Sequence, residues 1–178
     1  AHDAHFASLQ HEPMKQAILT YMRWCDAKYQ PSTIHSCRAG VLGFFRWLQA
    51  AYPHITQLNG VTRPIALAYA TYLKQKVDDK TYSPKYRSDL YRRIRLFYEF
   101  VIVEGLAATP DRNVFAVGDT PEDPDPVPRY LTDQELQTIL RYVATAATAR
   151  ERVLVILLLH TGIRACEVVN LKSTDIVQ

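Results

Sequence analysis

The sequence has 178 residues, 48% of them hydrophobic. This length suits one ordinary domain or two small ones, and the apolar fraction excludes wholesale disorder. Lysine and arginine total 21 against 18 acidic residues, a formal net charge of +3. That balance is by itself a weak indication of a nucleic-acid partner.

The cysteines indicate the compartment. Cys25, Cys37 and Cys166 have neither metal-ligand nor redox spacing, and no signal peptide is recognisable. We therefore expect free thiols in a cytoplasmic protein, and no metal site. The longest apolar run, residues 153–159, is too short to cross a bilayer. It predicts a buried element of a soluble fold that has no membrane partner.

Residues 1–12 are expected to be a disordered N-terminus, and residues 13–115 a helical domain. Four segments of that domain have apolar positions at helical spacing. Ser32, Thr62 and Ser83 are the expected N-caps, and Gly105 is the expected stop signal. The predicted helices run from about Pro13 to Tyr29, Ser32 to Ala51, Arg63 to Val77 and Ser83 to Gly105.

The clearest boundary in the chain is residues 116–129, which hold four prolines and four acidic residues. Closely spaced prolines exclude helix and favour an extended, solvated segment, so we interpret this stretch as a linker between two domains.

Residues 130–178 are expected to form a second, smaller helical part. Thr132 and Glu135 have the spacing of a capping box, which predicts a helix to about Ala147. Further helices are expected from about Arg150 to His160 and from Arg164 to Asn170, and residues 171–178 weakly favour a strand.

The fourth helix of the first domain carries a basic face. Residues 80–95 hold six cations and one acid, Asp89. Helical geometry places Lys85, Arg92 and Arg95 opposite the apolar stripe, with Arg87 and Arg93 beside it. Such a row would follow a DNA backbone, although a merely solvated helix face explains the charge equally well. The candidate DNA-binding residues are Arg38, Lys85, Tyr86, Arg87, Arg92, Arg93 and Arg95.

The most specific motif runs from Leu157 to Leu171, LLLHTGIRACEVVNL. A helix is expected to end at Thr161–Gly162, after which a tight turn presents Arg164 at the start of the next helix. An arginine held there could bind a phosphate, and Glu167 lies within pairing distance. An ordinary surface ion pair is the alternative.

This motif resembles the first conserved box of the tyrosine recombinase (phage integrase) family. The box has a run of leucines, then Thr-Gly-hydrophobic-Arg-x-x-Glu, and later an Asp-hydrophobic pair; residues 157–176 show each feature. The segment 128–136, PRYLTDQEL, is similar to the beginning of the family's catalytic domain, and residues 13–115 resemble its four-helix, SAM-like core-binding domain.

The resemblance implies a mainly α chain that joins a core-binding domain, through the linker, to the first helices of a mixed α/β catalytic domain. Family members cut and rejoin DNA at recombination sites through a 3′-phosphotyrosyl intermediate, as homotetramers and without a cofactor. Arg164 matches the first phosphate-binding arginine, and Glu167 a supporting carboxylate.

The family's other catalytic residues find no match in this chain. The nucleophile is one of them, because none of the eleven tyrosines follows Arg164. We therefore expect an N-terminal fragment that is itself inactive. Two alternatives stay open: a non-catalytic DNA-binding regulator or truncated competitor, and a helical protein-interaction module.

Overall fold

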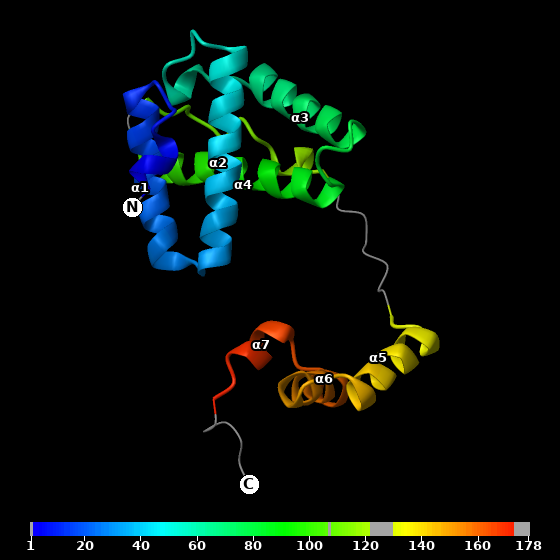
Figure 1. The fold of residues 1–178 in the computed structure, drawn as a ribbon. Coiled ribbons are helices and arrows are strands. Elements are labelled where there is room, and N and C mark those ends of the chain that lie inside the picture. Colours follow the sequence, from blue (N-terminus) through cyan, green and yellow to red (C-terminus); the bar gives the residue numbers. More distant parts are fainter. Residues whose placement is uncertain (1, 107, 122–129, 173–178) are drawn as a thin grey trace. The chain divides into compact units, whose positions relative to one another are not determined.

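The computed structural model describes residues 2–106, 108–121 and 130–172 (Figure 1). The chain divides into two compact units, Ala1–Asp125 and Pro126–Gln178. Within the described residues the regular structure is entirely helical, which confirms the prediction of a mainly α protein. The strand favoured for residues 171–178 lies largely outside the described residues.

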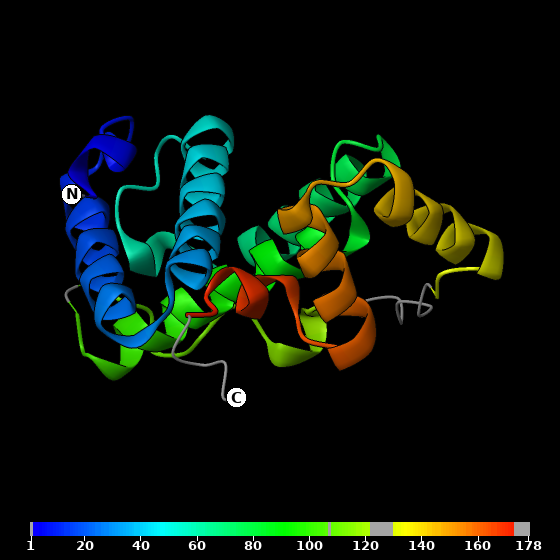
Figure 2. The same cartoon turned by 60° about the horizontal axis from the view of Figure 1, so that its bottom comes forward.

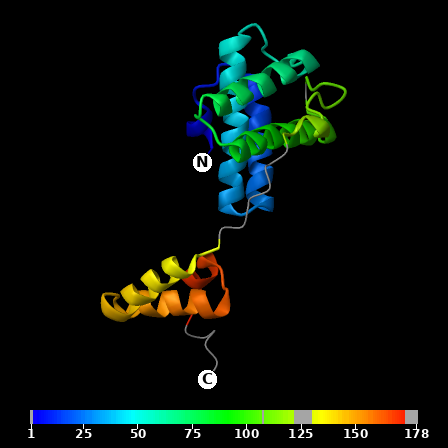
Figure 3. The same cartoon turned by 90° about the vertical axis from the view of Figure 1, so that its right-hand side faces the viewer.

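The described residues of the first unit form four α-helices. Figures 1 and 3 show α1 and α2 side by side as an antiparallel hairpin, with α4 crossing both. The pair α2 and α4 has the most extensive contact, and α3 packs against α4. These helices are α1 (Glu12–Lys28), α2 (Pro31–Ala51), α3 (Arg63–Asp78) and α4 (Pro84–Val103).

Local signals in the sequence explain where these helices begin and end. Each has proline in its first turn, where the missing N–H costs no hydrogen bond. The Ser83 hydroxyl caps α4 by accepting from the amide of Tyr86. Gly105 follows α4 with φ +59°, as predicted for a stop signal. The N-cap of α2 is Gln30, so the expectation of Ser32 was wrong by two residues.

Aromatic rings fill the core of this unit. Phe44 of α2 is fully buried. The centroid of its ring lies 4.9 Å from the ring centroid of Tyr69 on α3 and 6.3 Å from that of Tyr98 on α4. Phe115, which follows α4 in the chain, closes the cluster at 5.4 Å from Phe44. One ring thus joins α2, α3, α4 and the segment that leaves α4.

The crossing of α2 and α4 depends on Gly40. A Cβ atom at this position would lie 2.4 Å from the Cβ of Arg93 and 3.4 Å from the carbonyl oxygen of Leu90. We expect Gly40→Ala to force the helices apart and to lower the free energy of unfolding by about 1–3 kcal/mol.

Gly43 provides the matched control for Gly40. It is exposed on the same helix, and an added Cβ would meet only the Tyr69 hydroxyl, at 3.9 Å. Gly43→Ala should stabilise the unit by about 0.5–1 kcal/mol, because alanine favours helix. Urea unfolding followed by tryptophan fluorescence measures both changes. Equal effects of the two substitutions would contradict the close crossing.

The N-terminal segment is more ordered than its composition predicts. Asp3–Phe6 forms a 3-10 turn, and the Phe6 and Leu9 side chains are buried in the core of the first unit. The expectation of disorder over residues 1–12 is therefore wrong for residues 2–12. Two apolar side chains are enough to hold this segment, because the α1–α2 hairpin leaves a surface that they cover.

The first residues of the predicted linker belong to the first unit. Val117–Asp119 forms a second 3-10 turn against the first unit, and the buried Ser88 hydroxyl donates to the Pro121 carbonyl at 2.7 Å. The linker prediction is thus wrong for residues 116–121, which pack on α3 and α4. The remaining residues of that prediction, 122–129, lie outside the described residues.

Residues 130–172, the part of the second unit that the structure describes, form three consecutive helices, drawn yellow to red in Figure 2. They are α5 (Asp133–Thr145), α6 (Ala149–Thr161) and α7 (Ala165–Val169). The Thr132–Glu135 capping box of α5 is present as predicted, with Thr132 Oγ1 accepting from the Glu135 amide at 3.2 Å.

The apolar run 153–159 lies on α6, and no residue of α6 is buried among the described residues. The prediction of a buried element is therefore not met in this chain. The run is apolar around the whole helix, whereas α5 and α7 contact it on part of its surface only.

Candidate nucleic-acid interface

The basic residues cluster in the first half of α4. Its apolar face is buried through Leu90, Ile94 and Phe97, and the cations project from the remaining surface. Lys85, Tyr86 and Arg92 are exposed, whereas Arg87 is half-buried. The structure thus places four of the candidate residues on one short stretch that starts at the capped end of the helix.

Tyr86 is the exposed aromatic residue of this stretch. Its ring meets the ring of Tyr82 edge-on, with the ring centroids 5.0 Å apart, which restricts its orientation. A fixed aromatic ring next to cations is suited to contact a sugar or a base edge.

Arg92 is exposed, and it forms a weak ion pair with Asp89 within the helix. Its Nη1 atom lies 3.6 Å from Asp89 Oδ1, and its side chain is 45% exposed. An exposed pair at this spacing contributes little to stability. The ion pair with Asp89 is therefore only a small obstacle to a phosphate contact by Arg92.

Arg95 is placed less favourably than helical spacing predicts. Its side chain is only 20% exposed and pairs with Glu99 at 3.2 Å. Asn113, from the segment after α4, donates to the Arg95 carbonyl and covers that side of the helix. Helical spacing does not predict the low exposure of Arg95, because the segment that covers it is distant in the sequence.

Arg93 serves the packing of α4 on α2. Its Nε atom donates to the Ser36 hydroxyl at 3.1 Å, and its stem lies against Gly40. Arg38, also on α2, is half-buried. These two residues are therefore poorer candidates for a backbone contact than Lys85 and Arg92.

The turn around Arg164 lies in the other unit. Gly162 ends α6 with φ +65°, and the Thr161 hydroxyl donates to the Leu157 carbonyl at 2.6 Å. Arg164 is then the N-cap residue of α7, and its side chain is 83% exposed.

Glu167 stabilises this turn in two ways. Its carboxylate accepts from the Arg164 amide at 2.8 Å and lies 3.7 Å from the Arg164 guanidinium. The predicted pair is thus formed, and the carboxylate closes the turn from which Arg164 projects.

The described residues form neither a metal site nor a membrane-spanning helix. No group of three or more histidine, cysteine, aspartate or glutamate side chains is arranged to hold a metal ion. Among the same residues, no helix has the length and hydropathy needed to cross a membrane. The three cysteines are free thiols; Cys25 and Cys37 are buried and Cys166 is exposed.

One polar network was not foreseen from the sequence. Asp119 had been assigned to the linker, yet it binds Arg63 and Tyr91 of the helical unit. No local signal links position 63 to position 119. The only indication was the apolar pair Val114–Phe115 just before the acidic stretch.

Comparison with known proteins gave one relative of stated function. The chain is 26% identical over 155 residues to a protein named Tyrosine recombinase XerD from Xanthomonas axonopodis pv. citri (strain 306). The alignment covers 86% of this chain and 48% of that protein, so the chain spans about half the length of the relative. No family model and no solved structure matches the chain. The similarity supports a tyrosine-recombinase-like protein.

Proposed function

We propose that this chain is the DNA-binding portion of a site-specific tyrosine recombinase, and that the first unit binds duplex DNA through α4. The observation that carries the proposal is the division of α4 into a buried apolar face and an exposed cationic one. Lys85, Tyr86 and Arg92 lie together on the exposed part. The similarity to a tyrosine recombinase supports the same partner.

In this proposal Lys85 and Arg92 bind phosphates and orient the unit on the duplex. Contacts of this kind are independent of sequence and release counterions, so affinity falls with salt. Tyr86 and Arg87, at the start of the helix, are placed to contact base edges. Arg93 and Arg95 act through packing, and Arg38 is a secondary contact.

Arg164 is proposed to stabilise the phosphate that reacts. In the family's chemistry a tyrosine oxygen attacks the phosphorus, a 3′-phosphotyrosyl bond forms, and the 5′-hydroxyl leaves. A 5′-hydroxyl of a second strand then displaces the tyrosine. Negative charge grows on the phosphate oxygens during each step, and an exposed guanidinium can stabilise it.

Glu167 is proposed to support Arg164 rather than to react, because it holds the turn through the Arg164 amide. We assign the nucleophile to none of the tyrosines in this chain, since all of them precede Arg164. We propose the complete reaction, and the homotetramer on a recombination site, only for a protein that has the full length typical of the family.

Binding to a labelled 30-base-pair duplex, followed by fluorescence anisotropy, tests the proposal. With three or four phosphate contacts we expect the dissociation constant to rise roughly 40- to 150-fold between about 50 and 200 mM salt. An absence of binding at the lower salt concentration would favour the protein-interaction alternative. Binding that does not respond to salt would exclude a backbone contact by α4.

A further inference from the structure

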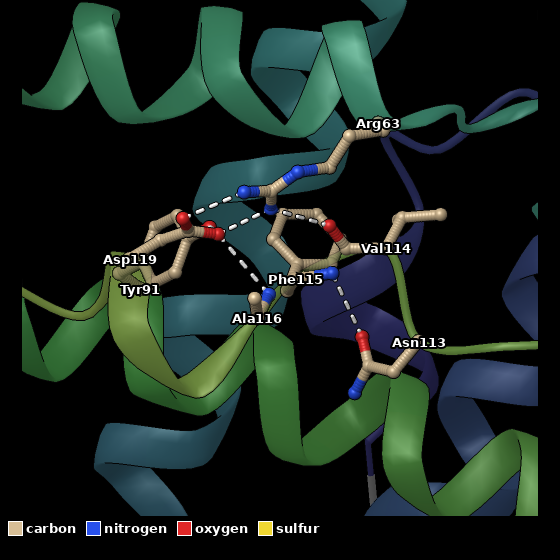
Figure 4. A network of polar contacts seen from close by, with 7 residues as sticks. All are labelled: Arg63, Tyr91, Asn113, Val114, Phe115, Ala116 and Asp119. Carbon is tan, nitrogen blue, oxygen red and sulfur yellow. Dashed lines mark hydrogen bonds and ion pairs between the residues drawn. The ribbon is translucent and has the colours of Figure 1, made fainter.

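The segment that follows α4 is held against the first unit by a compact polar network (Figure 4). At its centre, the Asp119 carboxylate accepts from Arg63 Nη2 at 2.7 Å, from the Tyr91 hydroxyl at 2.9 Å and from the Ala116 amide at 3.1 Å. Arg63 Nη1 also donates to Asp119. One side chain thereby joins the start of α3, the middle of α4 and the turn 117–119.

Further bonds extend the attachment on both sides of Asp119. Arg63 Nη1 donates to the Val114 carbonyl at 2.9 Å, and Asn113 accepts from the Phe115 amide at 3.0 Å. Ser88 holds the Pro121 carbonyl. Because Phe115 is also buried, the chain is fixed to the unit from residue 113 to residue 121.

The electrostatics stabilise this attachment at neutral pH. The Arg63 guanidinium lowers the pKa of Asp119 to about 2, and burial raises the pKa of Tyr91. A carboxyl group with a lowered pKa contributes stability above its unfolded value of about 3.9 and loses that contribution as the pH falls toward 2. The network therefore stays closed throughout the physiological range.

We propose that Asp119 is a positioning residue that fixes where the chain leaves the helical unit, and so sets how far the second unit can reach on DNA. This inference rests on the proposed function. Nine peptide steps separate Pro121 from Tyr130, which span at most about 32 Å. When all the bonds that hold residues 116–121 are open, the chain departs from Phe115, and fifteen steps span at most about 54 Å.

The consequence for binding is one of effective concentration. When one unit occupies the duplex, the other unit binds intramolecularly. A longer connection between the units lowers the effective concentration of the second unit at the DNA. Asp119 thus contributes to DNA binding without touching DNA.

The chain contains a natural pair of probes for this test. Both tryptophans, Trp24 and Trp47, lie in the first unit, and the exposed thiol, Cys166, lies in the second. A dansyl-type acceptor on Cys166 therefore reports energy transfer from one unit to the other. Cys25 and Cys37 are fully buried and should not react, which Cys166→Ser verifies.

The test compares Asp119→Ala with Asp111→Ala, an exposed aspartate of the same segment. In Asp119→Ala we expect hydrogen exchange of the amides from 116 to 120 to accelerate roughly tenfold to a hundredfold, because charge-assisted hydrogen bonds are lost. Energy transfer to Cys166 should fall in the same variant. Asp111→Ala should change neither quantity.

Unchanged exchange in Asp119→Ala would overturn the inference, and so would faster exchange with unchanged energy transfer. If that variant unfolds the unit, Tyr91→Phe removes a single bond and keeps the ring on Phe115, and a smaller change in the same two readouts is expected. These outcomes are distinguishable from failure of the proposed function, which would appear as an absence of salt-dependent DNA binding by the unmodified chain.

Discussion

Replacing both Lys85 and Arg92 by glutamate is expected to weaken binding to duplex DNA by roughly a hundredfold at low salt. Two phosphate contacts are lost, and two negative charges are placed against the backbone. The dependence of log affinity on log salt should also become shallower by about 2, because two fewer counterions are released. Both side chains are exposed, so neither substitution opens a cavity in the core.

The matched control reverses two exposed cations elsewhere in the first unit. Arg46→Glu with Lys74→Glu changes the net charge by the same amount, but Arg46 lies on α2 and Lys74 on α3. We expect this variant to lose much less affinity and to keep the salt dependence. Equal losses in the two variants would show that net charge, rather than the α4 face, attracts DNA.

Phe44→Ala is expected to lower the free energy of unfolding of the first unit by about 3–5 kcal/mol. The ring is fully buried and contacts rings from α2, α3 and α4 and from Phe115. Its removal leaves a cavity at the point where these elements meet, and rigid aromatic neighbours cannot collapse to fill it. The melting temperature should fall by more than about 10 °C.

Thermal and urea unfolding followed by tryptophan fluorescence measure this change, because both tryptophans belong to the first unit. Phe44→Leu keeps most of the volume and should cost about 1–2 kcal/mol. A loss below about 1 kcal/mol for Phe44→Ala would mean that Phe44 does not join the elements of the unit.

The exposed apolar surface of α6 distinguishes the second unit from the first. Val153, Ile156, Leu158 and Leu159 all remain partly or largely exposed, and α5 and α7 bury few side chains with them. Stability in the described part of the chain is therefore concentrated in the first unit, where one continuous core joins its four α-helices. For this reason the stability predictions concern that unit only.

The positions of the helices were determined by the sequence alone. Proline in the first turn, the Ser83 cap, the Thr132–Glu135 box and the glycine stops act within four or five residues, so their effect can be read without a fold. The cationic half of α4 was visible for the same reason, since helical spacing relates neighbours in sequence to a common face.

Only the tertiary structure decided which residues are covered or tied down by distant segments. Arg95 is covered by the segment at Asn113, and Arg93 is held at the crossing with Gly40. Phe6 is buried in the core of the first unit. Asp119 is fixed to Arg63, a partner that lies more than fifty residues away in the sequence. Local pattern predicts where a helix lies, whereas exposure, and with it the choice between a DNA contact and a packing role, depends on contacts that local pattern does not encode.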